Sequence, residues 1–462
     1  MVARIIRSEK VLVNGLFKPA TIVVEAEKIM AIESFEFANT YPKDEIQLFD
    51  FGDRTLIPGL VDTHVHINEP GRAEWEGFVT ATQAAAAGGI TTVVDMPLNC
   101  SPVTTNVEAL KQKLTSLEGK LWIDCGFWGG VTPDSLDDLE DLIQAGVLGV
   151  KSFTIDSGLD EFPRVDENHV RAAIRTLANH DIPYLIHAEL EEDAPGNPGQ
   201  QTRDMRLGSY MSFLDSRPKD WENRAIDMMI SLAEEAKSDG VSIKIHIVHL
   251  SSADSIQTIQ QAKGRGLAIS TETCPHYLTL NAESIPDHNP LFKCTPPIRE
   301  QANNDKLWSG LESGVIDFVV SDHSPCTPAL KHLRTGDLSQ AWGGISSLQF
   351  GLPLIWTEAR KRGHSLEQVV EWMSFQPAKF AGLGCFKGQI AVGFDADLVV
   401  FNEDDGFQIT SESIMFRNKI TPYLDRHVSG VVEATFLRGK PIFEYGKLSQ
   451  KALGQPILRD VS

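Results

Sequence analysis

Two histidines stand two residues apart at the end of an apolar run. The run GLVDTHVH covers residues 59–66 and contains His64 and His66. In a β-strand, residues two apart point to the same face, so both imidazoles can reach one site at the end of the strand. A pair of imidazoles can bind a divalent metal ion, whereas the alternative is two histidines packed inside the protein. The pair alone does not decide between these interpretations.

Further side chains that can bind metal lie near the ends of four other apolar runs. They are Lys151, His187, His249 and Asp322. In a barrel of parallel strands, the carboxyl ends of the strands are where catalytic groups gather. The whole set therefore predicts a site for two metal ions. Nitrogen and carboxylate ligands favour Zn²⁺, with Mn²⁺, Fe²⁺ and Co²⁺ as alternatives.

Lys151 is the unusual member of this set, because divalent cations would repel a protonated lysine. A neutral lysine can instead add CO₂ and become a carbamate (N6-carboxylysine), which is an anion able to bridge two metal ions. The alternative is a lysine whose charge reaches solvent from the end of its strand. We predict that Lys151 is carboxylated.

For three other histidines, the sequence favours a supporting role over metal binding. His246 is three residues from His249, which places it on the opposite face of a regular strand. His323 follows Asp322 and should point away from the site. His276 lies in a CPHY turn, where it could support a ligand from behind.

Eight short runs rich in β-branched residues, each followed by polar or glycine residues and a helical pattern, indicate the architecture. These runs cover residues 59–66, 90–97, 121–129, 146–154, 183–189, 243–251, 268–276 and 316–324. Buried strands that alternate with helices form parallel α/β sheets, and eight is the count that closes a (β/α)₈ barrel. The alternative is an open doubly wound sheet, but this chain has no GxGxxG loop after its first strand, where such a sheet would carry one. We therefore predict an α/β fold with a TIM-like barrel.

The two ends of the chain do not follow this pattern. Residues 1–55 and 391–462 both contain short strands joined by turns, and neither segment alone could build a stable core. We predict that they form one small β-sandwich domain, with residues 56–390 as the catalytic barrel. An insertion at residues 191–222, after the fifth strand, is either part of the substrate pocket or a surface excursion.

Composition restricts the partners. The chain has 462 residues and a formal net charge of −21, which argues against nucleic acids and anionic membranes as partners. Its six cysteines form no CxxC pair and are typical of a reduced compartment, so those near strand ends are expected to be packed thiols. No apolar run is long enough to span a membrane. These features predict a cytoplasmic enzyme.

Motifs along nearly the whole chain resemble the cyclic amidohydrolases, the superfamily of dihydroorotases, dihydropyrimidinases and allantoinases. The motifs are HAE (187–189), HLSS (249–252), ETCPHY (272–277), KCTPPIR (293–299), SDHSP (321–325) and GQIAVGFDADLVVF (388–401). The resemblance implies that His64, His66 and Asp322 hold one metal ion. It places His187 and His249 on the other ion, with carboxylated Lys151 as the bridge.

The resemblance also implies the reaction, which is hydrolytic opening of a cyclic amide. Asp322 would take the proton of the attacking water and deliver it to the departing ring nitrogen. Dihydroorotases typically carry an arginine two residues after the HxH pair, where this chain has Asn68. Dihydropyrimidinases usually place a tyrosine shortly after the bridging lysine, and KSFTIDSG offers none.

The motifs NEPGRAEWEGF, DMPLN, SRPKDWE and AWGGISSLQ resemble those of allantoinases most, apart from Ala73, where a hydroxyl residue is expected. The implied substrate is allantoin, a neutral small molecule, bound by an enzyme that could be a homodimer or homotetramer. The expected hydrogen-bonding residues are Asn99, Thr295, Gly343, Gly344 and Arg72, the last with an ion pair that holds its loop as an alternative. Other possibilities are a dihydropyrimidinase or hydantoinase, a dihydroorotase, and a non-catalytic scaffold on the same fold.

Overall fold

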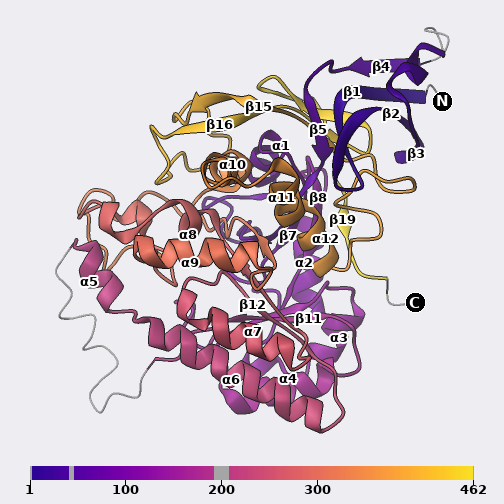
Figure 1. The fold of residues 1–462 in the computed structure, drawn as a ribbon. Helices are drawn as coiled ribbons and strands as arrows, with labels where there is room; N and C mark the ends of the chain where they lie inside the picture. The colour runs from indigo at the N-terminus through magenta and orange to yellow at the C-terminus, as the bar shows by residue number, and fades with distance from the viewer. Residues whose placement is uncertain (1–2, 41–45, 192–207, 461–462) are drawn as a thin grey trace.

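The computed structural model describes residues 3–40, 46–191 and 208–460, and its centre is a set of short parallel strands (Figure 1). These strands are β6 (Leu60–Val65), β7 (Ile90–Asp95), β8 (Asp124–Phe127), β9 (Gly129–Gly130), β10 (Val150–Phe153), β11 (Pro183–His187), β12 (Lys244–Ile247), β13 (Ile269–Thr273) and β14 (Phe318–Val319). All six residues of β6 are buried, as are all six of β7. Burial on both faces explains why these strands show no regular alternation of apolar and polar residues.

The strands close into a barrel. Strands β6, β7 and β8 pair in parallel, and β9 to β14 form a second parallel series. Strand β9 continues from β8 after one residue, which joins the two series. The barrel closes where the His66 N–H donates to the His323 carbonyl at 2.8 Å. The predicted eight-stranded barrel is confirmed, and the open doubly wound sheet is wrong.

Helices follow the barrel strands and pack around them. They are α1 (Phe78–Ala87), α2 (Val107–Ser116), α3 (Leu139–Gln144), α4 (Glu167–Leu177), α5 (Tyr210–Asp215), α6 (Lys219–Ser238), α7 (Ile256–Gly264), α8 (Pro275–Thr279), α9 (Gln301–Glu312), α10 (Gly351–Lys361), α11 (Leu366–Val370) and α12 (Gln376–Phe380). Helix α4 illustrates the local rules, because the Asp166 carboxylate accepts from the His169 N–H and caps its first turn. Its apolar residues recur at helical spacing and are buried: Val170, Ala173, Ile174 and Leu177.

The two ends of the chain together build a nine-stranded sheet beside the barrel, which we call the end sheet (Figure 1). Its strands are β1 (Ala3–Val13), β2 (Leu16–Glu25), β3 (Lys28–Glu33), β4 (Ile46–Asp50), β5 (Thr55–Pro58), β15 (Leu398–Gln408), β16 (His427–Leu437), β17 (Lys440–Glu444) and β18 (Lys447–Leu448). Strands β5 and β15 pair antiparallel and join the two ends. The end sheet has an apolar cluster of its own, which includes Ile22, Leu56 and Phe436.

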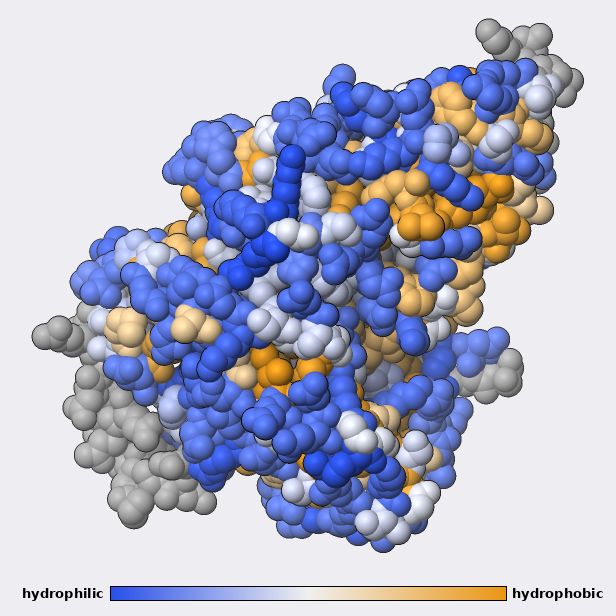
Figure 2. All heavy atoms as spheres, viewed as in Figure 1, coloured by the Kyte–Doolittle hydropathy of each residue, from blue (hydrophilic) through white to orange (hydrophobic). Residues whose placement is uncertain are grey.

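The last strand returns to the barrel. Strand β19 (Pro456–Ile457) pairs in parallel with β8. Residues that the sequence analysis assigned to the small β-sandwich domain therefore also contact the barrel. Figure 2 shows a mostly hydrophilic face, with apolar side chains gathered over the N-terminal part of the end sheet. In the described part of the chain, no helix is both long enough and apolar enough to cross a membrane.

Candidate active site

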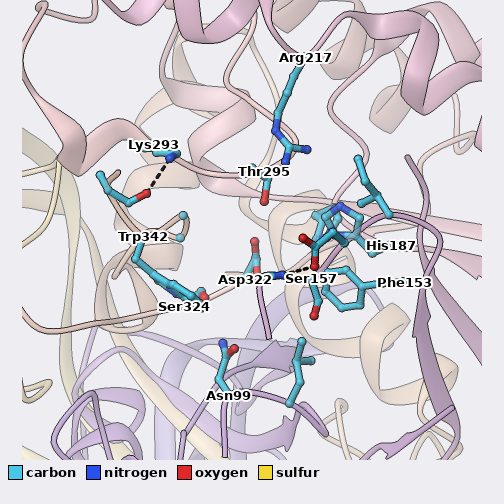
Figure 3. A pocket seen from close by; sticks show the side chains of 18 of the residues that line it. Asn99, Phe153, Ser157, His187, Arg217, Lys293, Thr295, Asp322, Ser324 and Trp342 are labelled. Carbon is cyan, nitrogen blue, oxygen red and sulfur yellow. Dashed lines mark hydrogen bonds between the residues drawn. The ribbon is translucent and has the colours of Figure 1, made fainter. Parts of the chain in front are cut away.

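All six candidate metal ligands line one cavity of about 430 Å³ at the carboxyl ends of the barrel strands. His64 lies within β6 and His66 just after it, Lys151 lies in β10, and His187 ends β11. The other two, His249 and Asp322, follow the ends of β12 and β14. Figure 3 shows Asp322, Thr295 and Asn99 pointing into this cavity.

Three of the ligands converge closely. His64, His249 and Asp322 each offer one ligand atom, and these atoms lie within 4.8 Å of one another. The Asp322 carboxylate lies 3.2 Å from His64 Nε2 and 3.7 Å from His66 Nε2. The rings of His187 and His249 are 4.6 Å apart, centre to centre. Burial lowers the pKa of all four histidines, which favours the neutral imidazoles that bind metal.

The backbone turns two of these side chains into the cavity. His249 has φ of 38° and Asp322 has φ of 43°, which is the left-handed region that non-glycine residues seldom adopt. Such backbone costs of order 1–3 kcal/mol per residue and persists only where the surrounding structure holds it, as at many functional sites. Sequence spacing along a regular strand could not have revealed these two turns.

A buried glutamate that the sequence analysis missed holds His64 from behind. Glu272 in β13 contacts His64 Nδ1 with one carboxylate oxygen and lies 3.1 Å from His246 Nε2 with the other. Burial raises the pKa of Glu272 to about 8. Because Glu272 takes up Nδ1, the Nε2 atom of His64 is left to face Asp322. His246 also bonds Ser270 and stacks on Phe318, in agreement with its predicted structural role.

A second missed glutamate supports His187. Glu189 lies 2.7 Å from His187 Nε2, and both of its oxygens accept from Arg217 Nη1, at 3.0 and 2.9 Å. Burial alone would raise the pKa of Glu189, but Arg217 and His187 outweigh it and lower this pKa to about 2. The HAE motif was the signal for Glu189, since residues two apart on a strand share a face.

Lys151 is fully buried, and its Nζ atom has no hydrogen-bond partner among the described residues. Burial lowers the pKa of this amine to about 8, against the opposing effect of nearby carboxylates. The Nδ1 atom of His249 is likewise buried without a partner in the described structure. An unpartnered amine and an unpartnered imidazole nitrogen are costly unless a ligand satisfies them. These residues therefore fit a metal centre.

The predicted substrate-binding residues divide into two groups. Asn99, Thr295, Gly343 and Gly344 line the cavity. Asn99 Nδ2 also lies 3.2 Å from His66 Nδ1, so this side chain orients a candidate ligand. Gly344 has φ of 119°, and an added Cβ would lie 2.4 Å from the Ser324 carbonyl oxygen, so no larger residue fits there.

Arg72 is not among the residues that line the cavity. Its guanidinium donates to the carbonyls of Asn99 and Cys100, at 3.3 and 3.2 Å, and pairs with Glu161. This geometry favours the alternative role, an ion pair that holds the loop. Contact of Arg72 with substrate remains a prediction.

The insertion is only partly described. Residues 192–207 lie outside the described residues, while residues 208–222 contain α5 and the first turn of α6. From this part, Phe213, Arg217 and Trp221 line the cavity. The insertion therefore contributes to the candidate pocket.

Two histidines beside the site differ in their contacts. His323 Nδ1 accepts from the backbone N–H groups of Ser347 and Leu348, and its Nε2 lies 3.2 Å from Glu76, in line with a supporting role. His276 is buried, and neither ring nitrogen has a hydrogen-bond partner among the described residues.

A closed barrel with imidazoles, a lysine and an aspartate at the carboxyl ends of its strands is typical of metal-dependent hydrolases. The profile of the amidohydrolase family matches residues 55–442, and the chain belongs to this family.

Comparison with individual proteins shows which members of the family this chain is similar to. The chain is 45% identical to the allantoinase of Saccharomyces cerevisiae, over 98% of both chains. It is 46% identical to the allantoinase of Streptomyces avermitilis, over 96% of both. Among solved structures, the L-hydantoinase (dihydropyrimidinase) from Arthrobacter aurescens superposes with a TM-score of 0.92 at 28% identity, covering 99% of this chain and all of that one. The resemblance to cyclic amidohydrolases is confirmed.

Proposed function

We propose that this chain is an allantoinase, which hydrolyses the hydantoin ring of allantoin to give allantoate. The observation that carries the proposal is identity of about 45% to allantoinases along the whole chain, in a protein whose six candidate ligands line one cavity. The similarity to hydantoinases is at lower identity, 28%, so it marks them as relatives and favours allantoin over hydantoin as the substrate.

The metal ligands would be His64, His66 and Asp322 for one divalent ion, and His187 and His249 for the other. Lys151 would bridge them as its CO₂ adduct, and its buried, unpartnered amine supports this role. When bound, the two ions, Zn²⁺ first and Mn²⁺, Fe²⁺ or Co²⁺ as alternatives, would act as Lewis acids that polarise the scissile amide carbonyl.

Asp322 would move the proton. Its carboxylate would take a proton from the attacking water as the new C–O bond forms at the ring carbonyl. It would then deliver that proton to the ring nitrogen as the C–N bond breaks, so the nitrogen departs as an amine-type N–H group and the former carbonyl carbon becomes a carboxylic acid, which releases the second water proton to solvent. Without bound cations, burial raises the pKa of the Asp322 carboxyl well above its ordinary value.

The cavity wall would bind the ring and its ureido tail. Allantoin is neutral and rich in N–H and C=O groups, so it needs hydrogen-bonding partners. The candidates are Asn99, Thr295 and the backbone at Gly343, whereas the N–H and C=O of Gly344 already bond to Lys293 and Lys331. A dihydroorotase would need a cation for the substrate carboxylate. Asn68 offers none, and its Nδ2 donates instead to the Pro325 carbonyl at 3.3 Å.

A four-substrate assay tests this function. Purified protein would be assayed with allantoin, hydantoin, dihydrouracil and dihydroorotate, each with and without added metal. We expect the highest kcat/KM for allantoin. A preference for hydantoin or dihydrouracil would assign a hydantoinase instead, and no turnover of any ring would favour a scaffold. A cytoplasmic location, a dimeric or tetrameric state, and the division at residues 55 and 391 remain predictions.

A further inference from the structure

A fully buried lysine lies directly behind the candidate substrate pocket. Lys331 is only 3% exposed and is not among the residues that line the cavity. Its ammonium donates to three backbone carbonyls, those of Lys293 at 3.1 Å, Trp342 at 2.9 Å and Gly344. Within the described residues, no carboxylate forms an ion pair with it.

These carbonyls belong to the two segments that form one side of the pocket, residues 293–295 and 339–344, which we call the pocket wall. Lys293 is two residues before Thr295, while Trp342 and Gly344 flank Gly343. The two segments meet directly, because an added Cβ on Gly343 would lie 3.6 Å from Thr295 Oγ1. Lys331 therefore bonds to backbone beside each candidate hydrogen-bonding group of the wall.

Other contacts join the same two segments. The Gly344 N–H donates to the Lys293 carbonyl at 2.9 Å. The Lys293 ammonium donates in turn to the Ala341 carbonyl at 2.6 Å. The Lys293 ammonium thus bonds residues 339–344 from the cavity side, and the buried Lys331 ammonium bonds both segments of the pocket wall.

Burying an ammonium without a carboxylate is costly, and hydrogen bonds to carbonyl oxygens offset only part of that cost. A methionine of similar length would fill the same space without the penalty. Residues 322–347 contain no regular strand or helix, so no backbone ladder fixes the carbonyls of this segment. The three N–H donors of Lys331 can fix them instead, which explains a lysine at this position.

We propose that Lys331 is a positioning residue that fixes the pocket wall, so that Thr295 and the backbone at Gly343 present their hydrogen-bonding groups to the substrate's ring and tail. The inference rests on the proposed function, because it assigns the binding side of that same site. Lys331 itself does not touch the substrate.

The test is the steady-state kinetics of Lys331→Met with allantoin. Loss of one or two well-placed hydrogen bonds to substrate should raise KM by about tenfold, while kcat per folded, metal-loaded enzyme stays within about twofold. A merely structural role would instead lower the folded fraction and leave KM unchanged. Lys237→Met is the matched control, because Lys237 donates to the carbonyls of Arg265 and Gly266 away from the pocket.

Lys331→Gln guards against a variant that fails to fold, since its amide keeps two N–H donors on a side chain one bond shorter. We expect a KM between those of the wild type and Lys331→Met. Wild-type KM in any folded Lys331 variant would overturn the inference. If the wild type hydrolysed another cyclic amide and not allantoin, the proposed function would fail, while the same comparison of KM with that substrate would still judge Lys331.

Discussion

Asp322 holds its carboxylate between two imidazoles, 3.2 Å from His64 Nε2 and 3.7 Å from His66 Nε2. Replacing it with asparagine keeps the shape but removes the group that takes the proton. We expect Asp322→Asn to lower kcat by about 10²–10⁴-fold, the usual contribution of general acid–base catalysis. Asp305→Asn, at an ion pair with Arg362 outside the pocket, is the control. Near-normal turnover in Asp322→Asn would remove it as the proton carrier.

Lys151 provides a second prediction for a single residue. Lys151→Ala should lack activity and bind less metal, because the bridging anion is lost. Short carboxylic acids should restore part of the turnover by replacing the carbamate. His64→Ala should be inactive too, but the same acids should not rescue it. Mass spectrometry of active, metal-loaded protein that found only unmodified Lys151 would contradict the carbamate.

The sequence placed six candidate ligands at strand ends, and all six line the cavity. Period two accounts for His64 and His66, whereas His249 and Asp322 reach the cavity through left-handed backbone that spacing does not reveal. It could not reveal Glu272, since that residue reaches His64 through the pairing of β13 with its neighbours. Nor could it show that Arg72 bonds backbone carbonyls beside the pocket, as its side chain has several acceptors within reach.

At the scale of elements, Arg217 lies in the connection between β11 and α6. It donates to Glu189, which in turn contacts His187. Arg217→Met would leave the buried Glu189 carboxylate without its cation. We expect metal affinity to fall about 10–100-fold, as is typical when a group behind a metal-bound histidine is disturbed. Competition with a chelator would measure this affinity. Arg224→Met, at an exposed ion pair on α6, should leave it unchanged, and equal affinities in both variants would refute the role of Arg217.

The eight predicted strands all exist, although several are shorter than their apolar runs. Strand β14 has only two residues, Phe318–Val319, within the run at 316–324. The last four residues of the run, 321–324, are polar but stay buried, so the composition of the run could not mark where strand pairing stops. The pocket wall could not be predicted either, because lysine–carbonyl bonds leave no periodic pattern.

For the whole molecule, a buried ion cluster joins the end sheet to the barrel. Lys387 contacts Asp124 of β8 at 2.7 Å, and also Asp395 and Asp397 at 2.9 and 2.7 Å. The three carboxylates could suggest a metal site, but cations of the protein already pair with them: Lys387 with all three and Arg438 with Asp124. The sequence predicted that both ends of the chain combine, because neither could form a core alone. It could not predict this cluster, in which Lys387 pairs with Asp124, a residue 263 positions away.

Removing the cation of this cluster should destabilise the protein. Lys387→Met would leave the buried Asp397 carboxylate without its cation, so we expect a loss of about 3–5 kcal/mol in the free energy of unfolding, although Asp124 keeps Arg438 and Asp395 keeps Lys28. Lys361→Met breaks an exposed pair with Glu358 and should cost less than about 1 kcal/mol. Denaturant unfolding followed by circular dichroism would compare the two. Equal stabilities would show that the cluster does not hold the two parts together.

The central claim is that imidazoles, an aspartate and a carboxylated lysine at the barrel rim bind the metal ions that ring opening requires. The most direct measurement determines metal content and allantoin turnover on the same sample, before and after chelation and after metal is added back. The account predicts about two divalent ions per active chain, loss of turnover with their removal, and recovery with their return. A folded sample that opens the ring at full rate without bound metal would contradict it.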